Sequence, residues 1–292
     1  IALRLVGSEM CIRDSVSAEA AVEAAVVRMR QINPDLNAVV VDLGDCAVER
    51  AASLDKQRAA GRLCGPLHGV AVTIKINVDQ TGHATSNGVS ALQHNIAQEN
   101  APIVRNLTDA GAVVIGRTNT PEFSFRADTD NPLHGRTHNP WGRHVSPGGS
   151  SGGAAAAVMA GFGALAHGND IGGSLRFPAA ATGAVTLKPG LGRVPAYNPS
   201  QTAERGMLAQ SMSVQGLITR SADDLHLSMP SIIATDIRDP FHVPLPYHGA
   251  PMTGPARVAV SKANFGFDLH PEISYAIDLA ADALSDAGYE VE

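Results

Sequence analysis

Two short segments rich in glycine and serine carry the hydroxyl groups best suited to nucleophilic chemistry. One segment reads SPGGSSGG over residues 146–153, and the other reads DIGGS over residues 170–174. A serine hydroxyl attacks a carbonyl carbon only if a base removes its proton and hydrogen-bond donors stabilise the oxyanion that develops. The sequence must therefore supply a base and a set of donors close to one of these serines.

The donors that we expect are the peptide N–H groups of Ile171, Gly172 and Gly173, which directly precede Ser174. Glycine has no Cβ atom, so its backbone can approach a substrate carbonyl closely, and successive N–H groups can form a nest that binds an anion. Removing one such donor typically lowers the rate about a hundredfold or more. This position makes Ser174 a candidate nucleophile.

Lys75 is the candidate base. Val70, Val72 and Ile74 alternate with smaller or polar residues, and this period of two predicts a strand over 69–75 that ends at Lys75. Burial among apolar neighbours would lower the pKa of the amine and leave part of it neutral. Two structural interpretations stay open, because a lysine at a strand end commonly extends to solvent and GGSSGG is also typical of a turn or a phosphate cradle.

The elements that must position these groups alternate between helices and strands. Ser17 and Asn100 are expected as N-caps of the first and third helices, and Asn33-Pro34 is expected to end the first. Helices are predicted over 18–32, 45–60, 101–110, 154–160 and 271–287, and strands over 36–41, 69–75, 112–115, 257–260 and from 289 onward. This alternation predicts an α/β fold with both faces of the sheet covered.

The composition excludes several classes of function. The net charge is −6, and no run of Lys and Arg with interleaved aromatic residues occurs, so we expect no nucleic-acid partner. Nothing approaches 18 consecutive apolar residues, so we expect no membrane span. Cys11, Cys46 and Cys64 have no metal-ligand spacing and are odd in number, which favours a reducing cytoplasm over a disulfide framework. The histidines form no HExxH pair, and we predict neither a metal nor a cofactor.

Lys75 in GVAVTIKIN, Ser150 in SPGGSSGG and Ser174 in NDIGGSLRFPA together resemble the amidase signature family. Ser150 follows Lys75 by 75 residues and precedes Ser174 by 24, and both intervals are usual in that family. Further matches are TNTPEF at 118–123, NPW at 139–141 and LKPGLGRV at 187–194. The resemblance is close over about 32–195 and weaker afterwards.

The resemblance implies roles for individual residues. Ser174 would be the nucleophile that forms an acyl-enzyme, and Lys75 would be the base. The hydroxyl of Ser150, held by a cis peptide bond with Gly149, would relay the proton between them. Ser151 and Gly149 would help to bind the substrate or its oxyanion. The implied substrate is a small-molecule amide, no cofactor is needed, and a homodimer is one expected assembly.

The resemblance also implies a mixed central β-sheet flanked by helices on both faces. Asp170 and Arg176 flank the nucleophile turn, and we expect them to pair and hold it. Three positions depart from the usual pattern: Ile76 stands where an acid is usual, Asn169 where Ser or Thr is commoner, and Phe177 where tRNA-linked amidotransferase subunits usually have glutamine. Ile76 removes a negative charge that would hold a proton on Lys75.

Other interpretations remain beside the amidase. GGSSG at 148–152 matches the GxSxG of α/β-hydrolases, but the residues before it do not form a predicted strand. A phosphate-binding module is a further interpretation, but the GxxxxGK[ST] motif typical of phosphate-binding loops does not occur. An inactive or incomplete amidase fragment stays open, and so does an A-type amidotransferase subunit. We expect residues 1–15 to be a non-native tail and 16–292 to be a single amidase signature domain, truncated at its C-terminal end.

Overall fold

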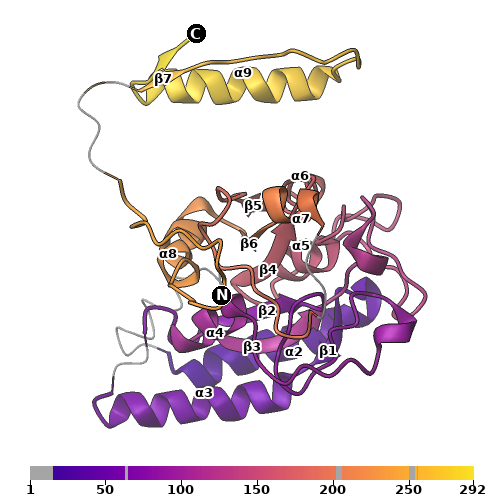
Figure 1. The fold of residues 1–292 in the computed structure, drawn as a ribbon, viewed down its shortest axis with the longest axis vertical. Helices are drawn as coiled ribbons and strands as arrows, with labels where there is room; N and C mark the ends of the chain where they lie inside the picture. Colours follow the sequence, from indigo (N-terminus) through magenta and orange to yellow (C-terminus); the bar gives the residue numbers. More distant parts are fainter. Residues whose placement is uncertain (1–15, 63–64, 202–205, 250–253, 255) are drawn as a thin grey trace. The chain divides into compact units, whose positions relative to one another are not determined.

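The computed structural model describes residues 16–62, 65–201, 206–249, 254 and 256–292 (Figure 1). These residues divide into two compact units, one ending at Tyr247 and the other covering His248–Glu292. The predicted tail at 1–15 lies outside the described residues. The expectation of one amidase signature domain over 16–292 stays a prediction.

The first unit is built on a six-stranded sheet. Its strands are β1 (Val39–Asp42), β2 (Ala71–Lys75), β3 (Val113–Thr118), β4 (Leu165–Asp170), β5 (Val185–Thr186) and β6 (Val214–Thr219), in the order β1-β3-β2-β4-β6-β5. The central strand β2 runs parallel to both β3 and β4, and the other neighbours pair antiparallel. The mixed central sheet is therefore confirmed.

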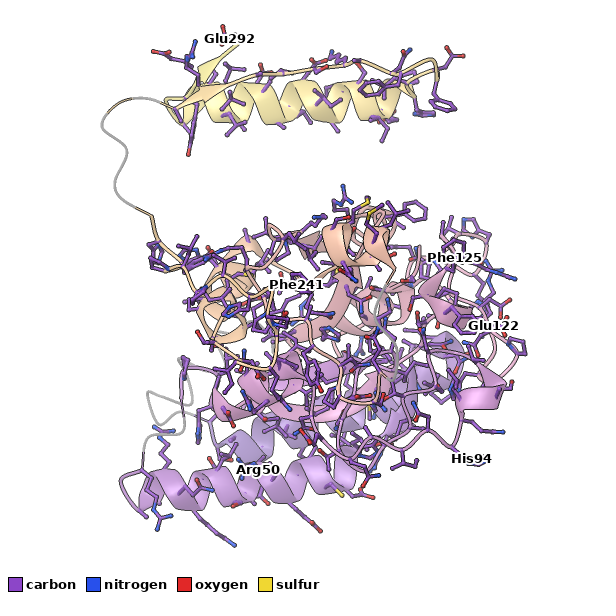
Figure 2. The ribbon with its side chains drawn as sticks, viewed as in Figure 1. Arg50, His94, Glu122, Phe125, Phe241 and Glu292 are labelled. Atoms are coloured by element: carbon purple, nitrogen blue, oxygen red, sulfur yellow. The ribbon has the colours of Figure 1, made fainter. Side chains whose placement is uncertain are left out.

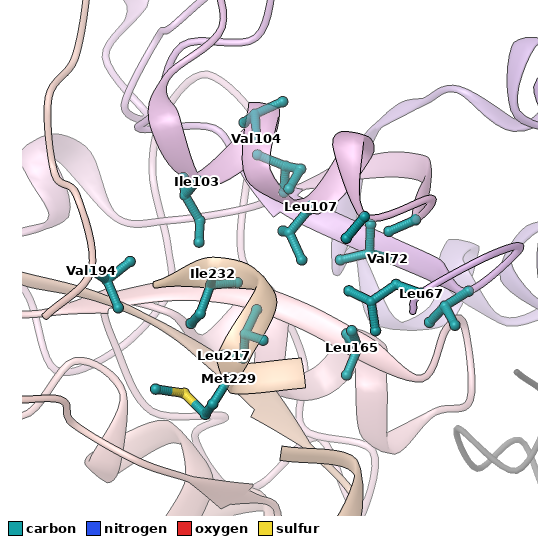
Figure 3. Close-up of a cluster of buried hydrophobic side chains, with 14 of the residues drawn as sticks. Leu67, Val72, Ile103, Val104, Leu107, Leu165, Val194, Leu217, Met229 and Ile232 are labelled. Atoms are coloured by element: carbon teal, nitrogen blue, oxygen red, sulfur yellow. The ribbon is translucent and has the colours of Figure 1, made fainter. Parts of the chain in front are cut away.

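Helices cover both faces of this sheet, as expected. They are α2 (Ala18–Leu36), α3 (Gly44–Ala59), α4 (Pro102–Asp109), α5 (Gly152–Met159), α6 (Arg176–Thr182), α7 (Met207–Met212) and α8 (Ala222–Ile232), with short 3-10 turns η1 (Ser90–Leu92) and η2 (Glu122–Ser124). The helices α4 and α8 pack on one face through a cluster of buried side chains (Figure 3). The helices α2, α3 and α5 contribute to a second cluster on the other face. The outer side of α3 carries exposed residues such as Arg50 (Figure 2).

The pleat of β2 decides where Lys75 points. Val72 and Ile74 belong to the α4/α8 cluster, whereas Ala71 belongs to the cluster that contains alanines of α5. Successive side chains of a strand alternate between its two faces. Lys75 therefore projects from the same face as Ala71 and Thr73, toward the helix that follows the SPGGSSGG segment.

Two details of the helix boundaries differ from the sequence predictions. The first helix does not end at Asn33-Pro34 but continues to Leu36. A proline this close to a C-terminus removes a single helical hydrogen bond, and the last turn is closed by the N–H of Asn37 donating to the carbonyl of Asn33. Asn100 is not the N-cap of α4, because its Oδ1 accepts from the backbone N–H and the hydroxyl of Thr81 instead.

The second unit consists of β7 (Arg257–Val258), α9 (Pro271–Asp286) and β8 (Glu290–Val291), and its two strands pair in parallel. The order of strand, helix and final strand is the one predicted. In the part of the chain that the structure describes, no helix has the length and apolar character needed to cross a membrane.

Candidate active site

The carboxyl ends of the parallel strands gather the candidate residues at one edge of the sheet. Lys75 ends β2, Asp170 ends β4, and Thr120 follows β3 closely. The serine loop before α5 reaches the same edge, because a Cβ atom on Gly168 would collide with Ser151, and one on Gly148 would collide with the backbone at the start of α6. The SPGGSSGG segment therefore packs against residues that lie on both sides of the DIGGS segment in the sequence.

Lys75 is fully buried and touches three oxygen atoms. Its Nζ atom lies 2.7 Å from Oγ of Ser150, 2.8 Å from Oδ1 of Asn169 and 3.1 Å from Oγ of Ser151. Burial lowers the pKa of Lys75 to about 7, and the charge of Asp170 opposes this shift only in part. A substantial fraction of the amine is thus neutral near neutral pH and able to accept a proton. The alternative of a solvent-exposed lysine is wrong.

Ser150 is held in direct contact with the candidate base. The Gly149-Ser150 peptide bond is cis, and Ser150 is buried against Lys75. The hydroxyl of Thr120 donates to the Ser150 carbonyl at 3.0 Å. The missing Cβ of Gly149 leaves room for the backbone of residues 126–128. The predicted cis bond and the predicted contact between Lys75 and Ser150 are both confirmed.

Asp170 organises the turn that carries Ser174. Its carboxylate accepts from the N–H groups of Gly173 at 2.8 Å and Leu175 at 3.1 Å, and two nitrogens of Arg176 donate to it at 3.0 Å each. Although burial raises the pKa of this carboxyl, the hydrogen bonds from Arg176 and the backbone hold it at about 2. The predicted pairing of Asp170 with Arg176 is confirmed.

One expected donor of this turn is engaged elsewhere. The N–H of Gly173 donates to Asp170, so it faces the carboxylate rather than an incoming carbonyl oxygen. Gly173 has φ of +115°, a conformation that glycine adopts readily, and this conformation shapes the turn. Ile171 and Gly172 lie at the surface, and the absent Cβ of Gly172 faces open space. Their N–H groups remain the expected oxyanion donors.

Ser174 lies half-buried between this turn and α6. Among the described residues, no hydrogen bond joins the Ser174 and Ser150 hydroxyls. The structure therefore brings Lys75, Ser150 and Ser151 into direct contact. It places Ser174 on a neighbouring turn, linked to that cluster through Asn169 and Asp170.

Several polar residues at this site have no role in the sequence predictions. Asn77 exchanges two hydrogen bonds with Asn169, and its amide nitrogen also donates to Ser124 at 2.9 Å. His167 is fully buried. Its Nδ1 atom accepts from the backbone N–H of Lys75 at 3.4 Å, and its Nε2 atom lies 2.9 Å from Oε1 of Gln215. Burial lowers the pKa of His167 to about 4, which keeps the ring neutral beside Lys75. The sequence offered one signal for this network, because Ser124 directly follows the TNTPEF segment that matches the family.

Two further features bear on cofactors and ligands. No three His, Cys, Asp or Glu side chains gather in a way that could hold a metal ion within the described ranges. A cavity of about 550 Å³ lies elsewhere in the first unit, and its lining includes Tyr197, Arg238 and Phe241 but none of Lys75, Ser150 and Ser174. The chemistry that we expect therefore does not coincide with this cavity.

Comparison with known proteins places these features in context. An indoleacetamide hydrolase of Bradyrhizobium diazoefficiens is 53% identical over 277 residues, which cover 95% of this chain and 53% of that protein. The A-type subunit of a glutamyl-tRNA(Gln) amidotransferase of Heliobacterium modesticaldum is 36% identical over 291 residues, which cover 97% of this chain and 58% of that protein. The chain thus spans a little over half the length of these relatives.

A solved structure and a family model agree with the sequence relatives. The structure of a bacterial aryl acylamidase of the amidase signature family superimposes with a TM-score of 0.87 at 30% identity and covers 98% of this chain and 59% of that one. The model of the family described as Amidase matches residues 20–292. Because that match includes both glycine-serine segments and Lys75, this chain belongs to the amidase signature family.

Proposed function

We propose that this chain hydrolyses the C–N bond of a small-molecule amide through an acyl-enzyme on Ser174. The observation that carries the proposal is the 2.7 Å contact between the buried amine of Lys75 and the Ser150 hydroxyl. A lysine whose pKa is lowered to about 7 can take a proton from a hydroxyl, whereas an ordinary lysine cannot do so at neutral pH. This pair therefore supplies the base that a serine nucleophile needs.

In the acylation step, the Ser174 Oγ atom attacks the amide carbon and its proton passes to Ser150, which gives its own proton to neutral Lys75. The carbonyl oxygen gains negative charge and is stabilised by the N–H groups of Ile171 and Gly172. The tetrahedral intermediate then collapses and its C–N bond breaks. The nitrogen receives the proton back from Lys75 through Ser150 and leaves as a neutral amine or ammonia.

Deacylation runs through the same groups. A water molecule attacks the ester carbon of acylated Ser174, and Lys75 accepts its proton through Ser150. Collapse of the second intermediate breaks the bond between the acyl carbon and Oγ, and the proton returns to Ser174. The products are one carboxylic acid and one amine or ammonia for each amide and water consumed.

For the substrate, we propose a primary amide of an arylacetic acid. The relative named indoleacetamide hydrolase is 53% identical to this chain. Ile171 and Phe177 flank Ser174 in the sequence and are 38% and 45% exposed, so apolar side chains are available next to the nucleophile. An aromatic acyl group would bury against such side chains.

An assay with indoleacetamide tests this proposal. The chain should release indoleacetic acid and ammonia in equal amounts, and Ser174→Ala should release neither. Free glutamine serves as the contrasting substrate, because an amidotransferase subunit is also similar to this chain. At position 177, however, this chain has phenylalanine where such subunits usually have a glutamine residue. Hydrolysis of glutamine without hydrolysis of indoleacetamide would reject the arylacetamide assignment.

The homodimer and the cytoplasmic location stay predictions.

A further inference from the structure

The amine of Lys75 is surrounded by oxygen atoms that carry no formal charge. Ser150, Ser151 and Asn169 each place one oxygen within 3.1 Å of Nζ. An ammonium group can donate to all three of them. A neutral amine has only two N–H bonds and one lone pair, so one of the three contacts must reverse its direction when Lys75 loses its proton.

The contact with Asn169 cannot reverse, because its Oδ1 atom only accepts. A chain of hydrogen bonds fixes which end of this amide faces Lys75. The Ser124 hydroxyl donates to Oδ1 of Asn87 at 2.7 Å, so it accepts from the Asn77 amide nitrogen at 2.9 Å. Oδ1 of Asn77 then accepts from the Asn169 amide nitrogen at 3.0 Å. This sequence of donors leaves Oδ1 of Asn169 directed at the amine.

The contact with Ser151 also suits an acceptor. Its hydroxyl lies 3.4 Å from the carbonyl oxygen of Asn169, to which it can donate, and its oxygen then accepts from Lys75. Two N–H bonds of the neutral amine are thus directed at Asn169 and Ser151. The lone pair is left for Ser150, whose hydroxyl is the nearest of the three.

We propose that Asn169, held in place by Asn77, is a positioning residue that directs the lone pair of neutral Lys75 at the Ser150 hydroxyl. The proposal rests on the proposed function, in which Lys75 is the base. An asparagine suits this task because its oxygen accepts a hydrogen bond without a negative charge that would keep a proton on the amine. An aspartate of the same shape would do the opposite.

The other charged or titratable groups around Lys75 leave room for such an effect. His167 on β4 is neutral, Asp170 at the end of β4 is paired with Arg176, and Arg117 lies on β3. The helix α5 contributes only glycine, alanine, valine and methionine, and the buried face of α2 is equally free of charge. A carboxylate at position 169 would therefore be the only negative group in direct contact with the amine among the described residues.

The test compares pH profiles of kcat/KM for indoleacetamide. Asn169→Asp should move the ascending limb to higher pH by about one to three units, because a carboxylate in contact stabilises the ammonium form. Asn169→Leu should lower kcat at every pH with little change in KM, and Asn169→Ser should restore part of that loss. Gln57→Glu on α3 introduces the same amide-to-carboxylate change outside the network and should leave the limb in place.

Each outcome decides a different claim. An unmoved limb in Asn169→Asp, or a wild-type kcat in Asn169→Leu, overturns the positioning role, provided that circular dichroism shows the fold is kept. If Asn169→Leu does not fold, Asn169→Asp and Asn169→Ser still decide. Lys75→Met separates this result from the proposed function. An inactive Lys75→Met beside an unmoved limb rejects only the role of Asn169, whereas an active Lys75→Met with the wild-type limb rejects Lys75 as the base.

Discussion

The Nζ atom of Lys75 and the Oγ atom of Ser150 lie 2.7 Å apart, although 75 positions separate them in the chain. The parallel strand β2 ends at Lys75, and the loop before α5 brings Ser150 to the same edge of the sheet. Lys75 has no solvent-exposed surface, so its nearest proton donors are protein hydroxyls rather than bulk water.

Lys75→Ala should reduce amide hydrolysis by about two to four orders of magnitude, the usual contribution of a positioned base. Hydrolysis of the corresponding methyl ester should decline less, because an alkoxide leaves with less need of a proton than an amine does. Steady-state assays on indoleacetamide and its ester analogue measure both effects. Full amidase activity in Lys75→Ala would reject the role of this lysine.

The wild-type pH profile should rise as the pH passes through about 7. Lys75 accepts a proton only when neutral, and its pKa is lowered to about 7 by burial, so activity is present above that pH and lost below it. Initial rates between about pH 5.5 and about pH 9 test this expectation, because that range extends to both sides of the lowered pKa. A profile that is flat over this range would contradict it.

The same burial links stability to pH. The folded chain gives up the Lys75 proton near pH 7, whereas the unfolded chain keeps it up to the ordinary value of 10.5. The unfolded state therefore binds more protons between these values, and the wild type should gain stability relative to Lys75→Met as the pH rises, by at most about 1.4 kcal/mol per pH unit. Urea unfolding of both proteins at several pH values measures this difference. A constant difference would show that Lys75 is not desolvated.

The sequence predicts the main residues of the candidate site better than the polar residues that surround them. The alternation before Lys75 predicts its strand, and the resemblance to the amidase signature family predicts the contact of Lys75 with Ser150. The partners Asn77 and His167 were not predicted, because nothing in a strand pattern shows which polar side chains from distant strands meet at one edge. Topology decides that, by placing β2 between β3 and β4.

Helix ends and fine geometry were harder to predict than helices. Pro34 does not end the first helix, since a proline near a C-terminus removes only one hydrogen bond. The Gly173 N–H faces Asp170 rather than a substrate, a preference that depends on the three-dimensional turn. The sequence analysis does not predict β4, β5 or β6. In β4, Leu165–Asp170 contains glycine and polar residues and reads as a loop in isolation.

Asp170→Asn should destabilise the fold by about 1–3 kcal/mol, since the buried carboxylate accepts several charge-assisted and backbone hydrogen bonds. Its pKa is held at about 2 against an ordinary 3.8, so this contribution is complete above the ordinary value and declines as the pH decreases toward 2. Arg176→Met, which removes a half-exposed partner, is the milder matched change. Thermal unfolding of both variants checks the order, and equal losses would contradict it.

The central claim is that Ser174 is the residue acylated by the substrate. The most direct measurement is peptide mass mapping after rapid acid quenching of the wild-type chain with indoleacetamide. We expect an indoleacetyl adduct on the peptide that contains Ser174, no adduct in Ser174→Ala, and a retained adduct in Ser151→Ala. An adduct on Ser150 or Ser151 instead would contradict the assignment of the nucleophile.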